Sequence, residues 1–286
     1  MREAGVAVAR TLAVSYVRVA DVERITPRML RITFSGDALA SLMEDRPDQQ
    51  MKLCFPRPGQ RVPRLPEPDA EDTYGMRWYE AYLAIPEPER PLMRSFTVRS
   101  YDPGSGLMAV DFVLHGEGGP ATRWARAAGP GDVAGMVGPS SAYARPLPGA
   151  GHLLLAGDAS ALPAIGTILA SLPAGARATV CAEVADAAEE QRFDTAAELT
   201  VRWVHRDAGA SLLDAVRSAA LPGEGAAAWL AGEAGTVRAL RRHLVEERGL
   251  PRSAVEFSGY WRRALTQDDA PTEEDLAWAR ERAAGA

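Results

Sequence analysis

The chain has 286 residues, of which 47% are hydrophobic and 24% are charged, and its formal net charge is −6. This length favours two domains, and the composition is that of a folded globular chain and not of a disordered one. The acidic balance and the lack of a long basic run argue against nucleic acid or an anionic membrane as the main partner. Because no stretch reaches the length of a membrane span, we expect a cytoplasmic protein with no membrane span.

The first half of the chain has the pattern of β-strands. Its apolar runs are short, rich in β-branched and aromatic residues, and separated by Gly, Pro and Asp. They are VSYVRVADV, MLRITFSG, MKLCFP, RSFTVRSYD and LMAVDFVLH. This pattern predicts a small antiparallel barrel or sandwich. The proline-rich and acidic residues 58–91 are expected to form a surface excursion with a short helix near RWYEAYLA.

The pattern changes near residues 147–151, where strand-like and helical runs begin to alternate. The strand-like runs are HLLLAGD, ATVCAEV, LTVRWVHR, AAAWLAGE and AVEFSGYW, and the helical runs are ALPAIGTILASL, SLLDAVRSA and AGTVRALRRHLVEERG. This alternation predicts a parallel sheet covered by helices on both faces. We therefore predict domains at residues 1–147 and 148–286, with TEEDLAWARERAAG as a C-terminal helix that has a capping box.

The stretch RSFTVR precedes a glycine-rich turn. If it is a strand, Arg94 and Phe96 share one face, whereas Thr97 and Arg99 share the other. Solvated arginines on a barrel strand are the simplest interpretation. However, HGEGGPATRWARAAG follows, and its glycines would let backbone amides converge on an anion at a helix N-terminus. The pair of motifs suggests a bound diphosphate, with a plain strand-to-helix connection as the alternative.

The second half offers a nucleotide site at the carboxyl ends of its predicted strands, where parallel sheets bind ligands. The turns there are AGDASALP and AGEAG, in which Gly157 and Gly232 permit close backbone approach. Neither turn matches G-x-G-x-x-G, which favours a nicotinamide nucleotide that exchanges freely. The scattered histidines argue against a metal site, and Cys54 and Cys181 are expected to be buried free thiols.

The motifs RSFTVR, DFVLHGEGGPATRWA, GHLLLAGDASALPAI, WLAGEAGTVRALRRHL and GYWRR, in this order and at these spacings, resemble those of the siderophore-interacting protein family. These are flavin-dependent ferric-siderophore reductases of the ferredoxin reductase superfamily. The resemblance implies an FAD-binding antiparallel barrel, then an NAD(P)H-binding α/β domain, with the flavin between them. It implies that NADH or NADPH reduces FAD, which then reduces a ferric siderophore, and we expect a monomer. A flavoenzyme of secondary metabolism and a non-catalytic siderophore-binding protein stay open as alternatives.

The resemblance also implies roles for single residues. Arg94 would neutralise the FAD diphosphate, while Phe96 would stack on the isoalloxazine and Thr97 would hydrogen-bond near its reactive edge. The other implied cofactor-binding residues are Ser95, Val98, Asp111, His115, Gly116, Gly119, Ala121, Thr122, Gly157, Asp158, Ser160, Ala161, Gly232, Glu233 and Trp261. Lys52, Arg262 and Arg263 could attract an anionic ferric chelate, with solvated surface charge as the alternative.

Two points stay open at this level. Family members usually have tyrosine where Phe96 stands, so the stacking ring is kept but its hydroxyl is lost. Glu183 or Asp186 near the end of the second predicted strand of the α/β domain would favour NADH, whereas Arg202 and Arg206 would favour NADPH.

Overall fold

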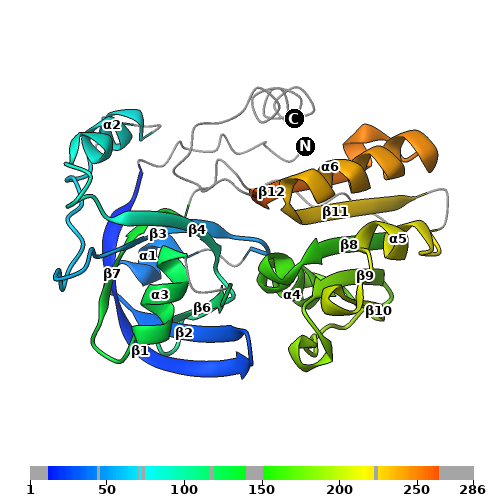
Figure 1. The fold of residues 1–286 in the computed structure, drawn as a ribbon, viewed down its shortest axis with the longest axis horizontal. Helices are drawn as coiled ribbons and strands as arrows, with labels where there is room; N and C mark the ends of the chain where they lie inside the picture. Colours follow the sequence, from blue (N-terminus) through cyan, green and yellow to red (C-terminus); the bar gives the residue numbers. More distant parts are fainter. Residues whose placement is uncertain are drawn as a thin grey trace, which may run out of the picture. The chain divides into compact units, whose positions relative to one another are not determined.

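The computed structural model describes residues 12–43, 46–69, 71–72, 75–115, 119–139, 151–221 and 225–263. The chain divides into two units, Met1–Ala144 and Arg145–Ala286, each with its own sheet (Figure 1). The boundary predicted between residues 147 and 148 lies outside the described residues and stays a prediction. Within the described ranges, no helix is long and apolar enough to cross a membrane.

The first unit is a seven-stranded sheet in the order β4-β3-β7-β1-β2-β6-β5. Its neighbouring strands pair antiparallel, which confirms the predicted antiparallel barrel. The strands are β1 (Val14–Thr26), β2 (Met29–Ser35), β3 (Gln50–Phe55), β4 (Leu92–Thr97), β5 (Ser100–Asp102), β6 (Leu107–Val113) and β7 (Val133–Val137). The helices are α1 (Leu39–Leu42), α2 (Met76–Ala84) and α3 (Pro120–Ala127). The helix expected near RWYEAYLA is therefore confirmed as α2.

The run RSFTVRSYD is not one strand as its pattern predicts, because β4 ends and β5 begins within it. At this break the amide of Val98 donates to the carbonyl of Gln49, at 2.8 Å, and still extends the pairing with β3. The next amide, that of Arg99, donates to the carbonyl of Ala109 in β6, at 2.9 Å. The two residues thus join β4 and β5, the strands at the two ends of the sheet order, while they bond to the residue before β3 and to β6.

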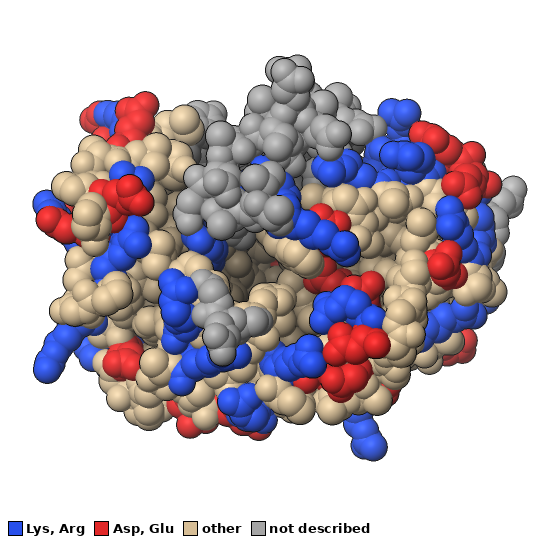
Figure 2. All heavy atoms as spheres, viewed as in Figure 1, with Lys and Arg blue, Asp and Glu red and all other residues tan. Residues whose placement is uncertain are grey.

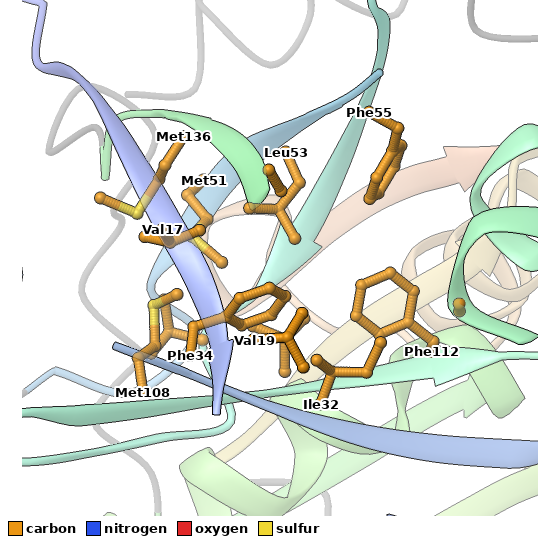
Figure 3. Close-up of a cluster of buried hydrophobic side chains, with 14 of the residues drawn as sticks. Val17, Val19, Ile32, Phe34, Met51, Leu53, Phe55, Met108, Phe112 and Met136 are labelled. Atoms are coloured by element: carbon orange, nitrogen blue, oxygen red, sulfur yellow. The ribbon is translucent and has the colours of Figure 1, made fainter. Parts of the chain in front are cut away.

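The interior of the first unit is filled by alternate residues of these strands. Ile32, Phe34, Phe55, Phe112 and Met136 are each at most 1% exposed and belong to one cluster (Figure 3). Burying a side chain of this size contributes about 1.5 to 3 kcal/mol, so this cluster is the main source of the unit's stability.

The second unit is a five-stranded parallel sheet in the order β10-β9-β8-β11-β12, as the alternation predicts. Its strands are β8 (His152–Asp158), β9 (Arg177–Val184), β10 (Glu198–His205), β11 (Ala226–Glu233) and β12 (Val255–Trp261). Its helices are α4 (Leu162–Ser171), α5 (Leu212–Arg217) and α6 (Ala234–Arg242), and a π-helical turn follows α6 at His243–Glu247. Buried side chains of α5 and α6 share one cluster with β8 and β11, whereas α4 contacts β8 outside it. The predicted C-terminal helix lies outside the described residues.

Candidate functional site

The strand β4 presents its residues to two faces of the first sheet. Arg94 is paired with Leu53 and Phe96 with Met51, and both partners on β3 are buried in the core. Since paired residues share a face, Arg94 and Phe96 lie together on the core side, which confirms their predicted common face. Ser95 is on the other face, where its hydroxyl accepts a hydrogen bond from Lys52 Nζ at 3.2 Å.

The ring of Phe96 is partly buried and continues the aromatic cluster of the barrel. Its centroid lies 4.4 Å from that of Phe112 and 6.0 Å from that of Phe55, which it meets edge to face. The ring centroid of Phe112 lies in turn 6.0 Å from that of Trp124 of α3. The cluster therefore fixes β4 beside α3, and the exposed part of Phe96 could stack on a planar ligand.

The N-terminus of α3 is suited to an anion. Gly119 is its N-cap residue, and no side chain in the described part of the chain caps it. Pro120 has no amide hydrogen, so the donors of the first turn include Ala121 and Thr122. Such amides carry the positive end of the helix dipole. Of the other predicted loop residues, His115 follows β6 and Gly116 lies outside the described residues.

Two cations lie close to each other near β4. Burial lowers the pKa of Lys52, and the charge of Arg94 lowers it further. Arg94 is partly buried, and its Nη1 donates to the carbonyl of Met93 at 2.7 Å. An anion beside these cations would relieve their repulsion. Arg94, the α3 amides and the Phe96 ring supply groups that fit the diphosphate and the flat ring of FAD, whereas Lys52 lies on the opposite face of the sheet.

Asp111 of β6 has a partner that the sequence pattern does not show. Arg31 Nε donates to its Oδ1 at 2.7 Å and Arg31 Nη2 donates to its Oδ2 at 2.9 Å, while Arg99 Nε lies 3.9 Å from Oδ2. This hydrogen-bonded carboxylate raises the pKa of Arg31. Asp111 lies on the sheet face opposite Phe112, where it binds Arg31 and lies beside Arg99; its predicted role in binding the cofactor stays a prediction.

In the second unit, the strands β8, β11 and β12 end at the same side of the sheet, which we call the carboxyl edge. The side chain of Asp158, the last residue of β8, makes hydrogen bonds that connect these three strand ends. Asp158 Oδ1 accepts hydrogen bonds from the amide of Ser160, at 2.9 Å, and from its hydroxyl. Asp158 Oδ2 accepts from the amide of Glu233 and from Trp261 Nε1, both at 2.8 Å. Four residues predicted to border cofactors are therefore in direct contact.

Two glycines allow this close packing. A Cβ on Gly157 would lie 2.5 Å from the carbonyl oxygen of Ala231. A Cβ on Gly232, which has a φ of +131°, would lie 2.5 Å from Asp158 Oδ2. The pairing of β11 with β12 shifts register just after Gly232, so that Glu233 pairs with Trp261. Such an irregularity re-aims a side chain, here the indole that reaches Asp158.

Of the candidate coenzyme determinants, Glu183 lies nearest to this edge, since it pairs in register with Asp158. Burial and the charge of Asp158 raise its pKa, while Arg206 and Arg263 oppose the rise. Asp186 instead caps a short 3-10 turn, where its Oδ1 accepts from the amide of Ala188.

The remaining candidates are basic. Arg202 of β10 donates to the hydroxyl of Ser218 at 3.2 Å. Arg262 and Arg263 follow β12, and the backbone amide of Arg263 donates to Glu233. The roles predicted for Lys52, Arg262 and Arg263 stay predictions.

We expect Glu183→Gln to raise the Tm at neutral pH. Because the folded chain raises the pKa of Glu183 above 4.5, folded protein holds this proton more tightly than unfolded protein does. Its stabilising contribution is therefore present at low pH and is lost as the pH rises above about 4.5. The Tm gain should be clear near pH 7 and absent near pH 4, as measured by thermal melts. Glu183→Asp is the charge-conserving control, and a lower Tm for Glu183→Gln near pH 7 would contradict the assignment.

The chain matches two family models. Residues 18–143 match the siderophore-interacting FAD-binding domain, and residues 150–264 match the siderophore-interacting protein model. The first unit therefore matches an FAD-binding domain in sequence, and the side chains of β4 and the N-terminus of α3 fit the same cofactor.

Individual proteins match along most of their length. An uncharacterized protein of Mycobacterium tuberculosis is 35% identical over 266 residues, which cover 87% of this chain and 90% of that protein. The ferric vibriobactin reductase of Vibrio cholerae is 30% identical over 261 residues, covering 88% and 92%. The crystal structure of a siderophore utilization protein from T. fusca has a TM-score of 0.75 and 36% identity, covering 91% of this chain and 96% of that one.

Proposed function

Since this chain belongs to the siderophore-interacting protein family, we propose that it is a flavin-dependent reductase that releases iron from ferric siderophores. The observation that carries the proposal is that Phe96, partly exposed, and Arg94 share one face of β4 in an FAD-binding domain whose helix α3 packs on the same aromatic cluster and has no side-chain cap. The similarity to a ferric vibriobactin reductase supports the same substrate class.

In this proposal the first unit holds FAD through residues of β4 and α3. Arg94 pairs with the diphosphate, and the first-turn amides of α3 donate to it. Phe96 supports the flat ring by stacking, and the buried Thr97 places a hydroxyl near it. When bound, FAD supplies the means to accept a hydride and to pass electrons on to a metal.

The electron donor in this proposal is NADH or NADPH, bound at the carboxyl edge of the second unit. Parallel sheets bind nucleotides at that edge, and Gly157 and Gly232 let backbone approach closely there. Because no G-x-G-x-x-G turn clasps the diphosphate, the nucleotide exchanges between turnovers.

The substrate is an Fe(III) chelate with oxygen ligands. Fe(II) is a softer ion of lower charge and suits hard oxygen donors less well, so reduction weakens the chelate and leaves the ligand intact. Lys52, Arg262 and Arg263 attract an anionic chelate. Figure 2 shows basic and acidic side chains interspersed among the described residues of the face in view.

The proposal is tested by following the flavin spectrum without oxygen. NADH or NADPH should bleach the flavin, and a ferric siderophore should restore its colour while a ferrous trap accumulates Fe(II). Catecholates, hydroxamates and carboxylates are tried in turn. A purified protein that binds no FAD would indicate a siderophore-binding protein. Flavin that is reduced but that no ferric chelate reoxidises would indicate an organic substrate.

A further inference from the structure

The carboxylate of Asp158 is buried, since the residue is only 8% exposed, and donors of its own chain surround it. A carboxylate has about four acceptor positions. Those of Asp158 receive the amide and the hydroxyl of Ser160, the amide of Glu233 and the indole of Trp261. Little of its accepting capacity is left for a bound nucleotide.

The indole that donates to Asp158 is that of Trp261, which lies at the same carboxyl edge but on another strand than Asp158. Trp261 is the last residue of β12, and β11 separates that strand from β8. The register shift after Gly232 brings Trp261 opposite Glu233, and the side chain then reaches across β11 to Asp158. Trp261 itself is only partly buried, so part of this residue is accessible at this edge.

We propose that Asp158 is a positioning residue: through its hydrogen bond to the indole, it fixes the Trp261 ring as one wall of the nucleotide site. This inference rests on the proposed function, which puts NADH or NADPH at the same edge. A charge-assisted hydrogen bond holds an indole far more firmly than solvent contact does, and a fixed aromatic wall binds a flat ring without first having to be ordered.

The test is a double-mutant cycle on the KM for whichever nucleotide reduces the FAD. In Asp158→Asn the indole loses its charged acceptor in either orientation of the new amide, and where the amide nitrogen faces Trp261 it loses its acceptor altogether. We expect the KM to rise about tenfold while kcat changes little, because binding and not the chemical step is affected. In Trp261→Phe, which keeps a ring but has no N–H, the KM rises as well.

The decisive comparison is Asp158→Asn in the Trp261→Phe background. If Asp158 acts through the indole, the second substitution adds less than about twofold to the KM. Additive effects would mean that Asp158 contacts the nucleotide directly, and they would overturn the inference. A lower Tm with an unchanged KM would also overturn it, because Asp158 would then only tie strand ends together.

Two measures separate the inference from general damage and from failure of the proposed function. Val216→Ala truncates a fully buried side chain of α5, so it should lower the Tm and leave the KM unchanged. If Asp158→Asn does not fold, Trp261→Phe and Trp261→Ala decide: both should raise the KM, alanine more, and an unchanged KM in both overturns the inference. A parent protein whose FAD neither nucleotide reduces would instead refute the proposed function.

Discussion

We expect Arg94→Ala to lose most of its FAD on dialysis at limiting FAD, whereas the parent chain should retain it. If Arg94 binds the diphosphate as proposed, the substitution removes the guanidinium that β4 supplies to it. A charge-assisted contact of this kind contributes about 1.5 to 3 kcal/mol, which is about tenfold or more in affinity. The measurement is the flavin absorbance per protein after dialysis against a series of FAD concentrations.

Two further arginine substitutions make this result specific. Arg94→Lys keeps the charge but not the two-pronged donor, so it should fall between the parent and the alanine variant. Arg18→Ala removes an exposed guanidinium of β1 that donates to the carbonyl of Gly131, and it should retain FAD like the parent. Equal retention by Arg94→Ala and the parent would show that Arg94 does not bind the diphosphate.

Phe96→Ala is expected to lose both flavin and stability. Its ring lies 4.4 Å from Phe112 and 6.0 Å from Phe55, so truncation opens the barrel cluster as well as removing the stacking surface. Deleting a buried ring costs about 3 kcal/mol, and the partial exposure of Phe96 puts the expected cost at or below this figure. The flavin content and the Tm of the purified variant measure the two losses.

Two other substitutions at this position separate stacking from packing. Phe96→Tyr keeps the ring and should bind FAD like the parent. Phe96→Leu fills much of the same apolar space without a ring, so its Tm should recover more than its flavin content does. Equal flavin content in all four proteins would place Phe96 away from the flavin ring.

Local pattern predicts much of this fold because several strands are defined by their own residues. The runs HLLLAGD and AAAWLAGE are apolar nearly throughout, as a strand covered on both faces must be, and they are β8 and β11. By contrast, β7 is the short run VAGMV, whose strand form depends on pairing with β1 and β3. The break at Val98 and Arg99 likewise follows from hydrogen bonds to two distant parts of the chain, Gln49 and Ala109, which period-two alternation does not record.

The candidate site shows the same division. The residue types at AGDASALP and AGEAG predict a ligand edge, because glycine and acid at the ends of parallel strands have a physical use there. Their partners are not predictable from the pattern. Arg31 lies 80 residues from Asp111, and only the register of β2 with β6 pairs them. The contact of Trp261 with Asp158 depends in the same way on a register shift between two other strand ends.

The distances along the chain from Asp158 to its donors also bear on how the second unit is made. Glu233 lies 75 residues after Asp158, and Trp261 lies 103 residues after it. During synthesis from the N-terminus, β8 and β9 leave the ribosome well before either donor exists, so the carboxylate stays hydrated until β11 and β12 arrive. Contacts of such long sequence separation are slow to form, and they make closure of the carboxyl edge a late event in folding. A nascent chain that stops before Val255 therefore exposes one side of β11 and lacks the indole that completes the edge.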